Sequence, residues 1–182
     1  MSPHAAALSA LGLEGAARER LGHYLDLLAS WAAHINLTAA RNPDERVRVL
    51  VAPVLPAAPL LAGRLLDIGS GNGSPGLVLA LLRPELPVTL LEPRTKRWAF
   101  LREAARLIGR PDVEVLRLRH DAYAGPAVAT VTLRALALPL SELGALVAPG
   151  GRLLVFGPAP QPAAPFAAEL SLPGPVHALR RR

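Results

Sequence analysis

Four groups of residues in this sequence have the types and spacing needed to bind a ligand. Asp67 is followed by glycines at positions 69, 71, 73 and 76, in the stretch RLLDIGSGNGSPG. Glycines let the backbone approach a ligand closely, and a helix that starts there offers free N–H groups. Polar side chains follow three later apolar segments, at Glu92, at His120-Asp121 and at Arg134. This spacing predicts a pocket for a nucleotide-like ligand.

A parallel sheet is the element that would bring these residues together. Apolar runs predict strands at 65–68, 87–91, 113–118, 127–133 and 152–156, and helices are predicted at 77–82, 95–108 and 141–147. Strands that alternate with helices form a doubly wound, mostly parallel α/β sheet, and its ligands bind at the carboxyl ends of the strands. Pro149-Gly150-Gly151 predicts a turn into the fifth strand, and short strands near 169–172 and 176–179 predict a hairpin at one edge.

The residues before the first strand predict a helical N-terminal extension, 1–62, attached to an α/β core, 63–182, in a single domain. Apolar positions at steps of three and four predict an amphipathic helix from Gly15 to Leu37. Asn42 followed by Pro43 is typical of a helix start, and this helix is expected to run to about Leu50. Three prolines then limit 51–62 to short helical turns.

Composition excludes several classes of function. The 182 residues contain no cysteine, which rules out disulfides, thiolate catalysis and thiolate metal sites, and no metal is expected. The net charge of +6 favours a polyanionic partner such as RNA or DNA, although an arginine-rich genome would also produce it. No apolar run approaches the roughly 20 residues of a membrane span, and no signal peptide is evident. We therefore expect a soluble, cytoplasmic protein with no membrane partner.

The glycine block fits two kinds of cofactor site. Gly71 to Gly76 matches G-x-G-x-x-G, which permits a nicotinamide-dependent oxidoreductase. However, the acid before the glycines, the helical extension and the late strand after Pro149-Gly150-Gly151 resemble the Rossmann-like S-adenosylmethionine-dependent methyltransferases. That resemblance implies a cofactor without phosphates. Gly69 and Gly71 would meet its methionine end, Asp67 would balance its ammonium group, and Glu92 would accept both ribose hydroxyls.

The later strand ends extend this hypothesis. His120-Asp121 lies where such folds contact adenine, and Arg134 closes the fourth strand at the edge where substrate and methyl group should meet. Each position also has a plainer interpretation. Glu92 would pair with Arg94 or Arg97, the histidine would be solvated, and Arg134 would be a surface residue.

Motifs spread from about Leu21 to Phe156 narrow the resemblance. They include Asn36-Leu-Thr, Arg41-Asn-Pro, the glycine block, Arg83-Pro and Thr89-Leu-Leu-Glu. Together they resemble the bacterial small-subunit ribosomal RNA guanine-N7 methyltransferase G family, also called glucose-inhibited division protein B. The resemblance implies methyl transfer from S-adenosyl-L-methionine to a guanine N7 of 16S ribosomal RNA. The implied cofactor contacts are Gly69, Ser74, Glu92, Pro93, His120, Asp121 and Arg134, beside Asp67, Gly71 and Gly73 in the same block.

This family implies 16S ribosomal RNA or the small ribosomal subunit as partner, rather than DNA, and we expect a monomer. Guanine N7 has a lone pair and no proton to lose, so alignment would carry most of the catalysis, and Arg134 is the catalytic candidate through guanine O6 or a phosphate. The chain departs from the family pattern around Leu50–Val54, at Ala129 and at Phe156. These departures keep open a second hypothesis, a non-catalytic RNA- or ribosome-associated relative that retains the fold.

Overall fold

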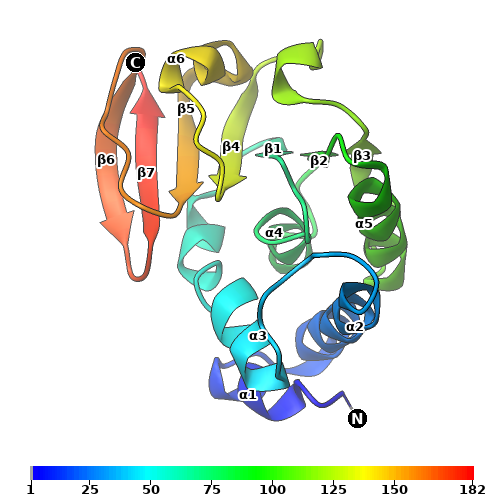
Figure 1. Ribbon diagram of the computed structural model, residues 1–182. Coiled ribbons are helices and arrows are strands. Elements are labelled where there is room, and N and C mark those ends of the chain that lie inside the picture. The colour runs from blue at the N-terminus through cyan, green and yellow to red at the C-terminus, as the bar shows by residue number, and fades with distance from the viewer. Residues whose placement is uncertain (1) are drawn as a thin grey trace.

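Strands and helices alternate along residues 2–182, the part of the chain that the computed structural model describes. Seven strands form one sheet in the order β3-β2-β1-β4-β5-β7-β6 (Figure 1). The first five strands are parallel, and β7 runs antiparallel to both of its neighbours, which confirms the predicted doubly wound sheet and its terminal hairpin. The strands are β1 Leu65–Ile68, β2 Val88–Leu91, β3 Glu114–Leu116, β4 Val128–Arg134, β5 Val147–Phe156, β6 Phe166–Leu172 and β7 Val176–Arg181.

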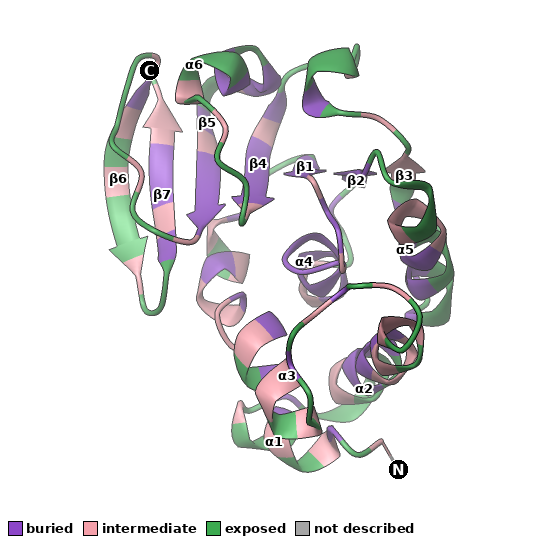
Figure 2. Cartoon of the chain, in the orientation of Figure 1, coloured by how far each residue is buried: buried purple, intermediate pink, exposed green. Residues whose placement is uncertain are grey.

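Helices cover both faces of this sheet. The N-terminal helices and the 3-10 turn at 55–60 pack with α4 and α5 on one face, and α6 lies on the other with the two later 3-10 turns (Figure 1). All but the last residue of α4 is buried, because this helix lies at the centre of the first layer (Figure 2). The helices are α1 Ala5–Ala10, α2 Gly15–Ala32, α3 Pro43–Leu50, α4 Gly76–Leu82, α5 Thr95–Leu107 and α6 Leu140–Leu143, with 3-10 turns η1 Leu55–Leu60, η2 His120–Ala122 and η3 Gly144–Leu146. None of the helices within residues 2–182 is long and apolar enough to cross a membrane.

The N-terminal helices follow the predicted pattern with two differences. Asn42 caps α3 as predicted, since its side chain accepts a hydrogen bond from the backbone N–H of Glu45 at 2.8 Å. The predicted helix to Leu37 is wrong at its end, because α2 stops at Ala32. Beyond that point the carbonyls of Asn36 and Leu37 accept hydrogen bonds from side chains elsewhere in the fold. Helix α1 was not predicted, and it is held by the fully buried Leu8.

The predicted helix at 141–147 is shorter than expected, and the predicted turn at Pro149-Gly150-Gly151 is wrong. A single α-helical turn, α6, passes into η3, and β5 already begins at Val147. The Pro-Gly-Gly segment is an irregularity inside β5, where the pairing shifts from Val128 with Val147 to Thr130 with Arg152. Gly150 has a φ of 71°, which a residue with a side chain rarely adopts, so glycine here permits the bulge.

Candidate active site

A cavity of about 370 Å³ lies at the carboxyl edge of the parallel strands. Ile68 and Gly69 at the end of β1, Glu92 and Pro93 after β2, and His120 in η2 line it. This is the position expected for a ligand in an open α/β sheet. The sequence-predicted residues Gly69, Glu92, Pro93 and His120 therefore meet in one cavity. Asp67, Gly71, Gly73, Ser74, Asp121 and Arg134 do not line it.

Glu92 is the carboxylate that faces both the cavity and the glycine loop. Its side chain is only 3% exposed, and Oε2 accepts a hydrogen bond from the backbone N–H of Gly71 at 3.0 Å. Oε1 accepts a second one from the backbone N–H of Arg94 at 2.8 Å. The alternative ion pair with the side chain of Arg94 or Arg97 does not form among residues 2–182. Each oxygen of a carboxylate accepts about two hydrogen bonds, so Glu92 keeps acceptor capacity on the cavity side.

Asp67 lies behind this wall rather than in it. Side chains alternate along β1, so Ile68 lines the cavity while Asp67 points to the layer of α4. The carboxylate is 1% exposed, and Oδ1 accepts a hydrogen bond from the hydroxyl of Thr132 at 2.6 Å, a pairing that the β1–β4 register sets up. Oδ2 is buried against Gly76 without a hydrogen bond of good geometry within residues 2–182. Burial raises the pKa of Asp67 to about 6, and the Thr132 hydrogen bond opposes that rise.

The glycine after the loop has a direct packing reason. A Cβ atom built on Gly76 would lie 2.5 Å from Asp67 Oδ2 and 2.6 Å from a methyl carbon of Leu90. Only glycine therefore lets the first turn of α4 sit directly on Asp67. In this position the carboxylate of Asp67 helps to pack α4 against the sheet. Its predicted role as counter-charge to a bound ammonium stays a prediction.

Arg134 and Ser74 join the α3 helix to the site. Arg134 Nη1 donates to Ser74 Oγ at 2.7 Å, and Nη2 donates to the carbonyl of Val49 at 2.7 Å. Ser74 Oγ in turn donates to the carbonyl of Leu50 at 2.6 Å. Helix carbonyls at a C-terminus lack partners within the helix, and a cation there also suits the helix dipole. Burial nevertheless lowers the pKa of Arg134. The guanidinium of Arg134 is therefore bonded to Ser74 and to the end of α3, outside the cavity. Its predicted catalytic role remains a prediction.

The remaining loop residues are fixed by the segment between α2 and α3. The Asn72 side chain donates to the carbonyl of Leu37 at 3.0 Å and accepts from the backbone N–H of Ser74 at 3.0 Å. The fully buried Tyr24 of α2 donates its hydroxyl to the Asn72 carbonyl at 2.7 Å. Gly73 packs beside Tyr24 and Leu77, with no room for a side chain. The loop is therefore preformed by contacts with the N-terminal extension.

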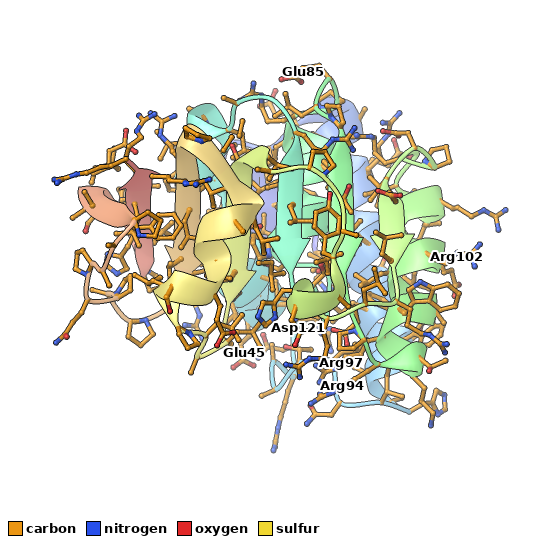
Figure 3. The ribbon with its side chains drawn as sticks, turned by 90° about the horizontal axis from the view of Figure 1, so that it is seen from above. Glu45, Glu85, Arg94, Arg97, Arg102 and Asp121 are labelled. Atoms are coloured by element: carbon orange, nitrogen blue, oxygen red, sulfur yellow. The ribbon has the colours of Figure 1, made fainter. Side chains whose placement is uncertain are left out.

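His120 and Asp121 have different environments although they are adjacent. His120 is 8% exposed, and its Nε2 lies 3.1 Å from Glu142 Oε2 of α6. Asp121 is exposed and pairs with Arg119 at 3.1 Å, and this hydrogen bond lowers the pKa of Asp121. In Figure 3, Asp121 lies at the same edge of the molecule as Arg94 and Arg97, while Glu85 lies at the opposite edge.

Two parts of the cavity wall were missed by sequence reasoning. The first is Arg97 of α5, whose Nη2 donates to the carbonyl of Asn36 at 2.8 Å. The second is the loop after β4, where Leu136 packs so closely on Gly69 that a Cβ there would lie 2.4 Å from its Cδ1. This loop could have been predicted as part of the site, because it follows a central parallel strand at the carboxyl edge of the sheet. The cavity-lining residues outside the prediction are Ile68, Arg94, Arg97, Leu118, Arg119, Ala135, Leu136 and Leu138.

Comparison with known proteins identifies the family. The profile of the GidB family, described as rRNA small subunit methyltransferase G, matches residues 17–156. The chain belongs to this family. A protein named ribosomal RNA small subunit methyltransferase G from Halorhodospira halophila is 42% identical over 149 residues, covering 79% of this chain and 71% of that protein. One of the same name from Xanthomonas axonopodis pv. citri is 40% identical over 149 residues, covering 81% and 68%.

Solved structures agree on the fold. A mutant of MtNAS in complex with S-adenosylmethionine has a TM-score of 0.62 at 15% identity, covering 96% of this chain and 82% of that one. The yhhF protein of Escherichia coli has a TM-score of 0.58 at 18% identity, covering 81% and 90%. At these identities the likeness concerns the fold, which is that of the Rossmann-like methyltransferases. As a member of this family with this fold, the chain is an rRNA small-subunit methyltransferase.

Proposed function

We propose that this protein transfers a methyl group from S-adenosyl-L-methionine to N7 of a guanine in 16S ribosomal RNA. The observation that supports it best is the cavity that Gly69, Glu92 and His120 line together. These residues come from the ends of three neighbouring parallel segments, at the edge where an open α/β sheet binds its ligand. Family membership supplies the ribosomal RNA substrate class.

The residues present fit this cofactor. Glu92 is buried and oriented by two backbone N–H groups, and it retains lone pairs for a pair of ribose hydroxyls. Gly69 has a φ of 66° and no side chain, so the backbone at the end of β1 is open to the cavity. Pro93, Leu118 and Leu138 add apolar surface that suits a purine ring. When bound, the cofactor would supply a methyl group on a positively charged sulfur.

The chain's own contribution would be orientation and exclusion of water. A guanine N7 carries a lone pair and no proton, so methylation there requires no general base. The loop is preformed by Tyr24 and Asn72, and Leu136 lies next to Gly69 in the cavity wall. Arg134 is proposed as a positioning residue, since it fixes Ser74 against the end of α3. These two hydrogen bonds use two of the five guanidinium N–H groups of Arg134 and direct it toward α3.

The experiment has a binding arm and a transfer arm. Calorimetry compares S-adenosyl-L-methionine and its demethylated product with NAD, which separates a methyl-donor site from a nicotinamide site. In the second arm, methyl-labelled cofactor is incubated with naked 16S RNA and with 30S subunits. Mass spectrometry of nuclease digests then identifies the labelled nucleoside, and 7-methylguanosine is the expected product.

A matched pair of variants ties the activity to the cavity. Glu92→Ala removes the buried carboxylate, and Glu85→Ala removes an exposed one at the opposite edge (Figure 3). We expect only Glu92→Ala to lose cofactor binding. Cofactor binding without methyl incorporation into either RNA substrate would instead favour the non-catalytic relative, and preferential binding of NAD would contradict the proposal.

A further inference from the structure

One side of the molecule, along α5 and the edge strand β3, carries cations without acidic partners. Arg94, Lys96 and Arg97 occupy the N-cap and first turn of α5, which has no acidic residue in that turn. Cations are unfavourable at this end of a helix, where the dipole is positive. A bound anion would reverse that penalty, because free N–H groups and positive side chains both attract it. Arg94 and Arg97 also line the cavity.

The cations continue away from the cavity along the exposed side of α5. Arg102 and Arg106 follow at helical spacing, and Arg117 at the end of β3 reaches the α5 N-terminus, donating to Thr95 Oγ1 at 3.2 Å. Figure 3 shows Arg102 projecting outward from α5. From Arg94 to Arg106 the helix spans about 18 Å. We call Arg94, Trp98, Arg102, Arg106 and Arg117 the α5 basic face.

Several arginines elsewhere in the fold are neutralised by acidic partners. Arg83 pairs with Glu85 at 2.6 Å, and Arg110 pairs with Asp112 at 2.7 Å. Glu169 pairs with two further arginines of the terminal strands. By contrast, none of the cations of the α5 basic face has an acidic partner within 4.0 Å among the described residues. The acids nearby are engaged elsewhere, Glu103 with Trp31 and Glu114 with Thr89.

An aromatic ring is built into this face. Trp98 is half-buried, and its indole N–H donates to the carbonyl of Val115 at 3.0 Å, which fixes the ring against β3. The Arg102 guanidinium lies 4.9 Å from the ring centroid. Surface hollows on either side of the helix share Arg102 and Arg106. A guanidinium held over a fixed ring keeps its N–H groups available for an external acceptor.

We propose that the α5 basic face binds the phosphate backbone of the RNA substrate and directs it from the cavity mouth along α5. The inference rests on the proposed function, since it places the substrate of the same site. Arginines spaced along a groove track a nucleic acid backbone, and an aromatic side chain among them adds stacking that does not depend on sequence. The α5 N-terminus would hold the phosphate nearest the modified guanine.

The test compares two double variants with equal loss of charge. Arg102→Ala/Arg106→Ala removes the outer half of the face, and Arg64→Ala/Arg182→Ala removes two exposed arginines elsewhere. Neither pair lies in the cavity. Filter binding measures the Kd for naked 16S RNA from about 50 to about 200 mM salt, a range in which phosphate contacts dominate the change. Calorimetry with S-adenosyl-L-methionine checks that each preparation has an intact cavity.

The face variant should bind RNA on the order of tenfold more weakly, with a log–log salt slope lower by about 1.4 for two lost contacts to single-stranded RNA. Its cofactor affinity and its rate at saturating RNA should match the wild type, so that only KM for RNA rises. Equal weakening in the Arg64/Arg182 variant, or unchanged affinity in the face variant, would overturn the inference while leaving the proposed function in place. A wild-type protein that binds cofactor but neither binds nor methylates RNA would overturn both.

Discussion

Replacing Asp67 by asparagine should change how the stability of the fold depends on pH. Burial raises the pKa of this carboxyl from its ordinary 3.8 to about 6. The folded protein therefore holds this proton up to about pH 6, whereas the unfolded chain releases it near 3.8. The protonated carboxyl therefore stabilises the fold at low pH. This contribution is lost as the pH rises from about 3.8 to about 6, and above that range the stability no longer changes through Asp67. Asparagine is neutral throughout, so Asp67→Asn has no such loss.

The magnitude follows from the two pKa values. The difference corresponds to about 3 kcal/mol in total, because each pKa unit is worth about 1.4 kcal/mol. Between about pH 4.5 and about pH 7.5, the free energy of unfolding of Asp67→Asn should rise by about 2 kcal/mol relative to that of the wild type. An asparagine amide facing Gly76 adds a cost of roughly 1–3 kcal/mol, but that cost does not depend on pH. The slope against pH is therefore the informative quantity, rather than the stability at one pH.

Urea denaturation of both proteins at several pH values measures this slope. The control is Asp121→Asn, which makes the same chemical change at an exposed carboxyl whose pKa is lowered by Arg119. The control should show no gain over the wild type as pH rises. If the free energies of unfolding of Asp67→Asn and the wild type ran parallel against pH, burial would not be what raises the pKa of Asp67.

Three further substitutions test the site and its supports. Glu92→Gln keeps the shape but halves the acceptor capacity, and it should weaken S-adenosyl-L-methionine binding about tenfold or more by calorimetry, with Glu85→Gln unchanged. Arg134→Ala should lower the free energy of unfolding by roughly 2–4 kcal/mol through loss of its bonds to Ser74 and α3, and lost methyl transfer at full stability would instead indicate direct catalysis. Asn42→Ala should cost about 1 kcal/mol in urea denaturation through loss of the α3 cap, and Asn42→Asp, which retains an acceptor, should restore most of it.

The order of the elements was predictable because it depends on local patterns. The apolar run at Leu65–Ile68, the glycines after it and the alternation that follows gave the sheet and its carboxyl-edge cavity. The Asn42-Pro43 cap was predictable for the same reason, since both of its interactions are made within one turn. Element ends were less accurate. Helix α2 stops at Ala32 because carbonyls beyond it bond to side chains distant in sequence, and no local pattern encodes those contacts.

The roles of individual side chains depended on which face of the sheet they point to. Sequence placed Asp67 and Arg134 at strand ends and predicted that both side chains would serve the ligand site. Alternation along the strands turns both toward the layer of α3 and α4, so Asp67 meets Thr132 and Arg134 meets Ser74 rather than the cavity.

The sequence by itself thus determined the succession of strands and helices along the chain, the glycine loop and the carboxylate Glu92, because each depends on residue type and short spacing. Tertiary structure alone decided that Arg97 and Leu136 join the cavity wall and that Arg134 supports α3. Those contacts link segments far apart in sequence, and they form only when the strands pair and the N-terminal segment packs against the sheet.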